Sequence, residues 1–583
     1  MMTAQPKTAG LLTGIRPAGD RAILVELASL AAVLSLQAQL TDHPQPGQVD
    51  VVAAAGTVLV GTDSPEAAAA LAAHVRTLDL AARPETGGAL VTIATVYDGE
   101  DLDEVAALTG LGRDGVIAAH SSQLWTAAFA GFAPGFAYLA AEYTGLEVPR
   151  RQSPRTAVPA GAVALGGAYS AIYPRRSPGG WQLIGSTDAE LWNLGRDNPA
   201  LIRPGDRVRF APVRARAGAL QGTAGRGAAA PERTPAPAPA VSPAPAVSAP
   251  AGLAVRQPGL QSTVQDLGRP GYAALGVSPA GAMDRAALRR ANRLAGNRED
   301  AAGIEVLHGG LELEALADQV LAVTGARVPL LITPAGTAAA TPPAAPADGA
   351  GGAAARAPRT ARAPRLPRRP EPDEPFALLA GECLSLGPPD AGLRSYLAVR
   401  GGIGVPPVLG SRSTDTMSGI GPEPLRAGSL LPVLPARAGS VVGLPEISPL
   451  PDPDGTVLRL VPGPRQDWFS AETLRDFLGQ EWTVTPRSNR IGLRLDGSPL
   501  ARERRGELAS EGTVRGAVQI PPEGQPVLFL SDHPVTGGYP VIGVVVHADL
   551  DKAAQLPPGA RVRFTAAGPP PGPAEPPKES PHA

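Results

Sequence analysis

Hydrophobic positions near the N-terminus form short runs that alternate with an alanine-rich segment. The runs AILVEL and VDVVAAAGTVLV have the apolar, partly β-branched composition of buried strands. The segment SPEAAAALAAHVRTL begins with Ser64, a favourable N-cap, and Pro65, a favourable first helical residue. This alternation predicts a small α/β domain over residues 1–87.

The rest of the chain is predicted to be mainly β-structure. Residues 88–214 begin with the strand pattern LVTIATVYD and the helix pattern DLDEVAALTGL, and then continue as short runs between Gly and Pro turns. Residues 252–567 contain many such runs and only two helix patterns, MDRAALRRANRLAG and SAETLRDFLG. In the first of these helices, Asp284 is expected to be the N-cap.

Four sequence landmarks recur in the same order in the two β-rich parts. The first part has Ala-Val at 162–163, Gly-Gly-Trp at 179–181, Ile-Gly at 184–185 and PGDRVRF at 204–210. The second part has Ala-Val at 517–518, Gly-Gly-Tyr at 537–539, Ile-Gly at 542–543 and PGARVRF at 558–564. The shared order predicts a duplicated β-barrel, since closing a sheet into a barrel removes its exposed strand edges.

Three stretches have a composition unsuited to a packed core. Residues 215–251 repeat Ala-Pro and predict an extended, disordered linker. Residues 334–375 are rich in Ala, Pro and Arg and predict a disordered insertion, although its basic cluster RAPRLPRR could also bind a partner or an anion. The Pro-rich tail, 568–583, is predicted to be disordered as well.

Charge and composition exclude several classes of protein. The 583 residues carry 52 basic and 54 acidic groups, which argues against a nucleic-acid-binding protein. The single cysteine excludes a disulfide framework and a cysteine-based zinc site. We find neither an apolar run long enough to span a membrane nor a secretory signal, so a cytoplasmic protein without a membrane partner is expected. Only Lys7, Lys552 and Lys578 are lysines, so anions would be bound by arginines or by backbone N–H groups.

Two histidines are candidates for acid–base chemistry. His120 could be a general base or a donor to phosphate, or it could be a buried structural histidine. His533 lies beside Asp532, which could fix the tautomer of the imidazole ring, and precedes the flexible residues Gly537 and Gly538. Because adjacent side chains of a strand point to opposite faces, an Asp532–His533 pair would require a turn.

Polar residues beside glycine-rich turns are candidates for binding a substrate or phosphate. The turn GFAPGF could present backbone N–H groups to an anion, or its phenylalanines could simply pack in the core. The dense polar run at Arg412, Ser413 and Asp415 would be costly to bury without partners. The remaining candidates are Arg155, Tyr173, Gln182, Arg269, Arg285, Asn489, Arg490 and Tyr539, with turn chemistry as the alternative. The chain lacks a GxxxxGK[ST] phosphate loop, and no spacing of His, Asp and Glu predicts a metal site.

Several of these blocks resemble a known family. GFAPGFAYLA (131–140), SPRTAVPAGAVALGG (153–167) and SAIYPRRSPGGWQLIGST (170–187) resemble the B subunit of 5-oxoprolinase. Four later segments resemble the C subunit of the same enzyme: PGLQSTVQDLGRPGY (258–272), AGAMDRAALRRANRLAGN (280–297), YLAVRGGIGVPPVLGSRSTDT (396–416) and SDHPVTGGYPVIG (531–543). The chain therefore looks like a fusion of the two subunits. Their modules, also called allophanate hydrolase subunits 1 and 2, form the carboxyltransferase part of urea amidolyase.

The resemblance implies a fold for each part. It implies a ferredoxin-like α/β domain at 1–87 and cyclophilin-like β-barrels elsewhere. The barrel at 88–214 would be carboxyltransferase subdomain A/B, and the β domains at 252–567 would be subdomain C/D.

The resemblance also implies ATP-dependent hydrolysis of 5-oxo-L-proline to L-glutamate together with a separate 5-oxoprolinase A subunit. ATP with Mg²⁺ would then bind wholly or partly on that partner, and self-association remains open. One alternative is a carboxyltransferase of the urea carboxylase type, which would use biotin from another chain because no lysine here follows methionine. The other is a regulatory module that resembles a kinase inhibitor joined to its antagonist.

Overall fold

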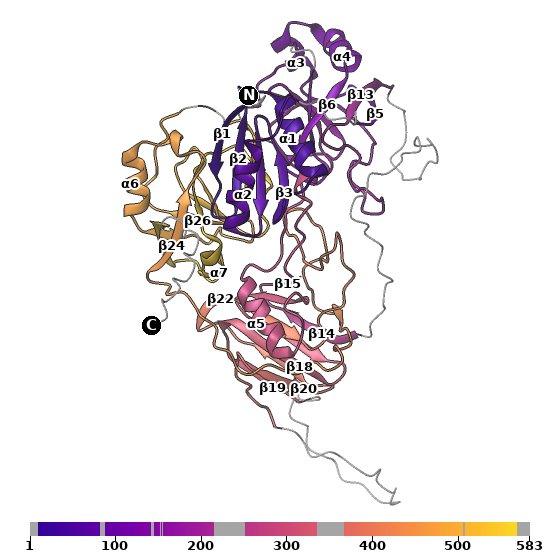
Figure 1. Ribbon diagram of the computed structural model, residues 1–583. Coiled ribbons are helices and arrows are strands. Elements are labelled where there is room, and N and C mark those ends of the chain that lie inside the picture. Colours follow the sequence, from indigo (N-terminus) through magenta and orange to yellow (C-terminus); the bar gives the residue numbers. More distant parts are fainter. Residues whose placement is uncertain are drawn as a thin grey trace, which may run out of the picture.

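The computed structural model describes residues 10–81, 88–141, 145–151, 153, 155–214, 251–334, 366–504, 506 and 508–567. They form four units: an N-terminal α/β sheet, a first barrel, a unit of two β-sheets and a second barrel. In Figure 1 the two-sheet unit occupies one end of the molecule, and the N-terminal sheet lies between the two barrels. The predicted linker, apart from Ala251, and the predicted tail lie outside the described residues.

The N-terminal unit is an antiparallel sheet in the order β1-β2-β4-β3. Ser29 and Ser64 cap its two helices by accepting hydrogen bonds from the amides of Ala32 and Ala67. The predicted α/β domain is confirmed, but only β2 to α2 follow the ferredoxin-like order, because β1 precedes them and fills the edge beside β2. Its elements are β1 (Leu12–Pro17), β2 (Ala22–Leu27), α1 (Leu30–Asp42), β3 (Gln48–Ala53), β4 (Thr57–Thr62) and α2 (Pro65–Val75).

The first barrel is a seven-stranded sheet in the order β12-β9-β10-β7-β6-β13-β5. A bridge between Val96 and Ser186, at the ends of its two outer strands, nearly closes it. A short ribbon of β8 and β11 lies outside this sheet. The elements are β5 (Leu90–Thr95), α3 (Leu102–Thr109), α4 (Gly112–Ser122), β6 (Trp125–Ala130), β7 (Ala137–Ala140), β8 (Arg155–Val158), β9 (Ala162–Gly166), β10 (Tyr169–Ile172), β11 (Ser177–Gly179), β12 (Gln182–Ser186) and β13 (Arg207–Pro212).

The second barrel is closed, in the order β24-β31-β28-β29-β26-β25-β32, and β27 and β30 form a separate ribbon. Its elements are β24 (Thr456–Pro462), η2 (Gln466–Trp468), α6 (Ala471–Gly479), β25 (Trp482–Val484), β26 (Gly492–Asp496), β27 (Glu511–Gly512), β28 (Ala517–Gln519), β29 (Val527–Phe529), β30 (Thr536–Gly537), β31 (Val541–Val545), η3 (His547–Asp549), α7 (Leu550–Ala554) and β32 (Arg561–Ala566).

The two barrels have the same topology, strand for strand. Each strand from β5 to β13 corresponds to the strand numbered nineteen higher, including the ribbon strands, and the neighbours match throughout. The first and last strands pair in parallel in both, β5 with β13 and β24 with β32. The duplication predicted from the four landmarks is therefore confirmed at the level of topology.

Between the barrels, residues 251–433 form two five-stranded sheets that share one apolar core. The β domains predicted at 252–567 are thus two structural units, and the barrel expected throughout is found only in the second, because the strands of the first form two packed sheets. Helix α5 lies against this unit and is capped by Asp284, as predicted, which accepts a hydrogen bond from the amide of Ala287. The elements are β14 (Ala251–Pro258), β15 (Gln261–Gln265), η1 (Ala273–Leu275), α5 (Arg285–Ala295), β16 (Gly303–Leu307), β17 (Leu311–Ala315), β18 (Gln319–Arg327), β19 (Leu330–Thr333), β20 (Pro375–Leu378), β21 (Cys383–Leu386), β22 (Ala391–Val399) and β23 (Leu430–Pro432).

The end of the predicted disordered insertion belongs to this fold. Residues 335–365 are outside the described part, but residues 366–375 are described. The backbone of Arg368 pairs with Ile332, and its guanidinium group binds Glu382. The carboxylate of Asp373 accepts hydrogen bonds from Ser448. The boundary predicted at 375 is wrong, because charged residues in a Pro-rich sequence find buried or half-buried partners here.

Candidate functional site

A cleft lined by aromatic rings opens on the first barrel where it meets the second. It has a volume of about 340 Å³. Four rings of the cleft, Phe132, Phe136, Tyr138 and Trp181, pack edge to face around Phe136 and Tyr138. The other lining residues are Arg150, Arg151, Tyr173, Gly179, Gly180 and, from the second barrel, Tyr539.

The turn from Gly131 to Phe136 shapes one wall of this cleft. Phe132 has a φ of 64°, which is unusual for a residue with a side chain, and its ring is 37% exposed. Its amide donates a hydrogen bond of 3.2 Å to the hydroxyl of Thr536 in the second barrel. Gly131 has no room for a side chain, because a Cβ atom would lie 2.1 Å from the same hydroxyl. The turn therefore joins the barrels and holds the partly exposed Phe132 at the cleft on strained backbone.

Polar groups in the cleft are placed to bind a small anion or a carbonyl group. Burial raises the pKa of Tyr173 to about 12, so its hydroxyl keeps its proton at neutral pH and can donate a hydrogen bond. Gly179 lies against this hydroxyl, where a Cβ atom would come within 2.3 Å of it. The guanidinium group of Arg150 lies 5.8 Å from the centre of the Trp181 ring.

A second cleft, of about 280 Å³, lies at the equivalent place on the second barrel. Gly537, Gly538 and Tyr539 take the positions that Gly179, Gly180 and Trp181 have in the first cleft. Tyr539 lines both clefts and is 45% exposed. The second cleft also contains the predicted residue Asn489, whose side-chain oxygen accepts hydrogen bonds from the amides of Ile491 and Gly492.

Beneath the clefts, Arg490 joins the second barrel to the two-sheet unit. Its side chain is 1% exposed and binds both carboxylate oxygens of Asp532, at 2.9 and 2.8 Å. It also pairs with Glu305 and donates to the carbonyl oxygen of Gly281. Two buried carboxylates share this guanidinium, and their charge raises the pKa of Arg490. The arginine therefore fixes how the units meet and uses four of its five N–H donors on protein groups.

Asp415 and Arg269 lie beside this pair. The carboxylate of Asp415 accepts hydrogen bonds from the amides of Met417 and Ser418, and burial together with the neighbouring Asp532 raises its pKa. Arg269 is buried and donates to the carbonyl oxygen of Ser413. Its Nη1 atom is buried and has no hydrogen-bond partner among the described residues.

The loop that carries Asp415 belongs to the two-sheet unit and contacts both barrels. Thr416 donates to Asp532 of the second barrel through both its amide and its hydroxyl group. Arg175 of the first barrel donates to the carbonyl oxygens of Met417 and Ser418, each at 2.6 Å. The two halves of the chain meet at this loop. The arginines that the sequence suggested as ligand contacts here, Arg269 and Arg490, donate to protein groups.

The expected Asp532–His533 pair is not formed. The carboxylate of Asp532 is directed to Arg490 and Thr416, while Nδ1 of His533 lies 2.9 Å from the carbonyl oxygen of Pro534. The ring of His533 stacks on Phe529 behind the second cleft. Burial lowers the pKa of His533 to about 4, and the nearby Arg515 and Arg285 favour the neutral ring further. Asp532 thus has a structural role in this arrangement, whereas His533 and Arg285 share a basic environment.

His120 occupies the core of the first barrel. It is fully buried, with Nδ1 2.8 Å from the Tyr97 hydroxyl and Nε2 2.9 Å from the Ser170 hydroxyl. Trp125 donates to the carbonyl oxygen of His120, five residues before it, and Trp482 donates in the same way to Phe477. His120 therefore takes the place that Phe477 has in the second barrel. His120 is therefore a buried structural histidine, the second of the two roles considered for it, since it lines neither cleft.

Replacing His120 with phenylalanine is expected to flatten the pH dependence of stability. Burial lowers the pKa of His120 to about 3, so unfolding below pH 6.5 is accompanied by proton uptake at this ring. Stability is lost as the pH falls from 6.5 towards 3, by about 2 kcal/mol between pH 7 and pH 5. Urea denaturation at both pH values checks this: the wild-type difference should exceed that of His120→Phe by this amount. Equal differences would contradict it.

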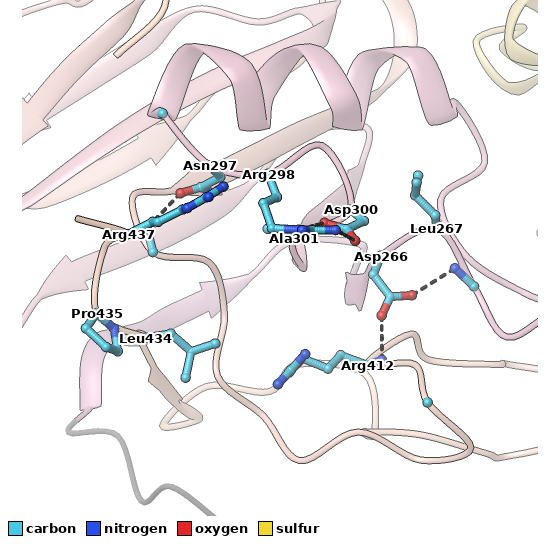
Figure 2. A pocket seen from close by; sticks show the side chains of 14 residues that line it. Asp266, Leu267, Asn297, Arg298, Asp300, Ala301, Arg412, Leu434, Pro435 and Arg437 are labelled. Carbon is cyan, nitrogen blue, oxygen red and sulfur yellow. Dashed lines mark hydrogen bonds and ion pairs between the residues drawn. The ribbon is translucent and has the colours of Figure 1, made fainter. Parts of the chain in front are cut away.

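The other predicted residues lie apart from the clefts or serve protein contacts. Arg155 pairs with Asp101 and Glu100, and Gln182 is buried with its amide 3.4 Å from the carbonyl oxygen of Pro149. Ser413 donates to Asp266. Arg412 lines a separate pocket of the two-sheet unit, which Figure 2 shows.

Sequence reasoning did not identify the rings of the first cleft as ligand contacts. For Phe132 and Phe136, packing in the core was one of two alternatives, and Arg150, Trp181 and Glu305 were not among the candidates. The repeated Gly-Gly-aromatic landmark was the available signal, because it marks the same wall in both barrels. Among the described residues, no group of three His, Cys, Asp or Glu side chains could hold a metal ion. The part of the chain that the structure describes has no helix long and apolar enough to cross a membrane.

The comparisons with known proteins match the two halves of the chain separately. Residues 13–202 match the family "Carboxyltransferase domain, subdomain C and D", and residues 275–350 and 352–566 match "Carboxyltransferase domain, subdomain A and B". The expected letters are therefore wrong, since the N-terminal half is C and D and the C-terminal half is A and B.

Curated relatives cover both halves. The chain is 36% identical to the 5-oxoprolinase C subunit of Escherichia coli K12 over 54% of this chain and 90% of the relative. It is 38% identical to the 5-oxoprolinase B subunit of Escherichia coli O157:H7 over 33% of this chain and 93% of the relative. Urea amidolyase of Lachancea kluyveri is 30% identical over 54% of this chain but only 17% of that enzyme.

A solved structure covers both halves at once. The crystal structure of TTHA0988 has a TM-score of 0.75 and 32% identity over 94% of this chain and 99% of that chain. The order of units, the two barrels and their relative positions therefore occur together in another single chain. By its domains, relatives and structure, this chain belongs to the carboxyltransferase-domain family that contains urea amidolyase and the B and C subunits of 5-oxoprolinase.

Proposed function

We propose that this chain is the fused B and C component of an ATP-dependent 5-oxoprolinase, which hydrolyses 5-oxo-L-proline to L-glutamate with a separate A subunit. The proposal rests on two separate matches. The N-terminal half aligns with 93% of a B subunit, and the C-terminal half aligns with 90% of a C subunit. Nearly whole subunits are joined here in one chain. The fusion keeps the two in a fixed ratio and orientation.

The first cleft suits a small cyclic amide that carries a carboxylate. Its aromatic walls can cover the ring, and the protonated Tyr173 hydroxyl can donate to the amide oxygen. The carboxylate can be bound by Arg150, which lies over Trp181, since Arg151 is already paired with Asp101. A volume of about 340 Å³ leaves room beside such a substrate for a phosphate group.

The chemistry explains why ATP is needed. A lactam resists hydrolysis because its amide is stabilised by resonance and its amine is a poor leaving group. Transfer of the γ-phosphoryl group to the amide oxygen releases ADP and makes that carbon electrophilic. One water then adds to the carbon and the C–N bond breaks. A second water releases phosphate and leaves glutamate.

The carboxyltransferase reaction of a urea carboxylase is a second candidate. It is favoured by the description of both matching families and by the similarity to urea amidolyase. The matched region is a small part of that enzyme, so biotin and its carboxylation would have to come from other chains. The aromatic cleft would then receive the bicyclic ring of biotin in place of 5-oxoproline.

Reconstitution with the partner protein tests the proposal. The purified chain is expected to form glutamate and ADP in equal amounts when it is mixed with ATP, Mg²⁺, 5-oxoproline and the A subunit. Omission of either protein should abolish both products. Glutamate is measured by an enzyme-coupled assay, and a reaction without ATP is the control. Carboxyl transfer from carboxybiotin to urea in the absence of glutamate formation would establish the second candidate instead.

A further inference from the structure

A pocket of about 450 Å³ lies in the two-sheet unit, away from the clefts of the barrels. Its walls come from the C-terminal end of α5, the turn after β15, the loop around Arg412 and the segment after β23 (Figure 2). The lining residues with side chains are Asp266, Leu267, Asn297, Arg298, Asp300, Ala301, Arg412, Leu434, Pro435 and Arg437. Four glycines complete the lining, so backbone forms much of the surface.

Three guanidinium groups face this pocket from two sides. Figure 2 shows Arg298 and Arg437 near Asn297, with Arg412 across the space from them. Arg298 is bound by both oxygens of Asp300. Arg412 uses Nε to donate to the carbonyl oxygen of Val405, which fixes its direction. Its two Nη groups and the whole guanidinium of Arg437 have no protein partner among the described residues.

The remaining carboxylate in the pocket, Asp266, does not pair with these guanidinium groups. One oxygen of Asp266 accepts hydrogen bonds from the amide of Gly268 and from the hydroxyl groups of Ser411 and Ser413. The other accepts from the backbone amide of Arg412, at 2.6 Å. Asp266 is therefore satisfied by neutral donors and builds the loop on which Arg412 stands. The three arginines and two aspartates of the pocket leave a net charge of about +1, and the guanidinium groups of Arg412 and Arg437 remain free to bind a ligand.

We propose that this pocket binds a small molecule with two oxyanion groups on a short apolar body. The free guanidinium groups of Arg412 and Arg437 stand on different walls, so each can bind one phosphate or carboxylate group. Leu267, Ala301, Leu434 and Pro435 provide an apolar surface between them. A diphosphate and a dicarboxylate share this chemistry. The proposal does not depend on the reaction proposed for the barrel clefts.

The pocket is linked to those clefts through one loop. Beyond Arg412, the same segment makes three contacts. The carbonyl oxygen of Ser413 accepts from Arg269, and Thr416 donates to Asp532. The carbonyl oxygens of Met417 and Ser418 accept from Arg175. A ligand that orders Arg412 would therefore order the junction of both barrels with the two-sheet unit. This gives the site a physical route to influence the clefts.

Titration calorimetry on the full chain tests the proposal, with pyrophosphate, ADP and glutarate as probes. We expect saturable binding of at least one probe, and the preference between the phosphate and carboxylate probes identifies the group. Arg412→Gln and Arg437→Gln should each weaken that binding at least tenfold. Arg426→Gln is the matched control, because Arg426 is exposed and pairs only with the nearby Glu423, and it should bind like the wild type.

Two results would overturn the proposal. One is that none of the three probes binds saturably. The other is that a probe binds but neither Arg412→Gln nor Arg437→Gln weakens it, which would place that ligand elsewhere, for example in a barrel cleft. Because Arg437 is exposed, its replacement should leave the fold intact, and a melting curve for each variant verifies this.

Discussion

Replacing Arg490 with alanine is expected to destabilise the protein by about 3–5 kcal/mol, because it leaves the buried Asp532 without a counter-charge and leaves Glu305 with Arg394 alone. Asp532 and Glu305 are 0% and 2% exposed and both bind this guanidinium. The second barrel should then separate from the two-sheet unit. Differential scanning fluorimetry should record a melting temperature lower by roughly 10 °C.

Two further variants make this prediction specific. Arg487→Ala removes an exposed arginine three residues earlier and should melt like the wild type. Thr416→Val removes one hydroxyl donor to Asp532 and should lower the free energy of unfolding by about 1 kcal/mol. This variant tests the same contact if Arg490→Ala does not fold. If Arg490→Ala melts at the wild-type temperature, the buried pair does not join these units.

Replacing Tyr539 with alanine should reduce kcat/KM of the reconstituted 5-oxoprolinase about tenfold or more, since the ring covers both clefts. The ring is 45% exposed in the free protein, so its removal should change the free energy of unfolding by no more than about 0.5 kcal/mol. Steady-state glutamate formation and a melting curve, measured on the same samples, separate the two effects.

Leu260→Ala is the matched control for Tyr539→Ala. Leu260 is 74% exposed and lies outside both clefts, so its removal should affect neither activity nor melting. Wild-type activity in Tyr539→Ala would show that the reaction does not use the surface shared by the barrels. A loss of activity with a lowered melting temperature would instead assign Tyr539 to the contact between them.

Both predictions concern the way in which the second barrel is held against the other units. The clefts lie on the barrels, but their relative position depends on contacts made by other units. The N-terminal sheet contributes to this: Glu26 pairs with Arg465 of the second barrel, and Asp50 accepts hydrogen bonds from the amides of Gly271 and Ala273. Ligand contacts by Tyr539 in the first cleft thus require the whole chain to be assembled.

The sequence predicted helix starts and the repeated barrel well, because capping and turn formation depend on residues a few positions apart. Ser64 and Asp284 cap helices as predicted, because a side-chain oxygen there reaches a free amide of the first turn. The duplicated barrel was also visible in the sequence, since the glycines and apolar residues that close one barrel recur in the other. The prediction that the basic segment before Pro375 is disordered was wrong for residues 366–375. Composition cannot reveal that Arg368 has a buried carboxylate, Glu382, as its partner.

The roles of charged and ionisable residues depended on long-range contacts. The sequence by itself determined the mainly β fold, the N-terminal α/β unit and the two related barrels, because strand periodicity, capping and turn residues act over a few positions. Only the tertiary structure decided that Asp532 faces Arg490 and not His533, that His120 lies in a core where the other barrel has Phe477, and that Tyr539 serves two clefts. Such partners are far apart in the sequence, and burial determines which of them a charge can reach.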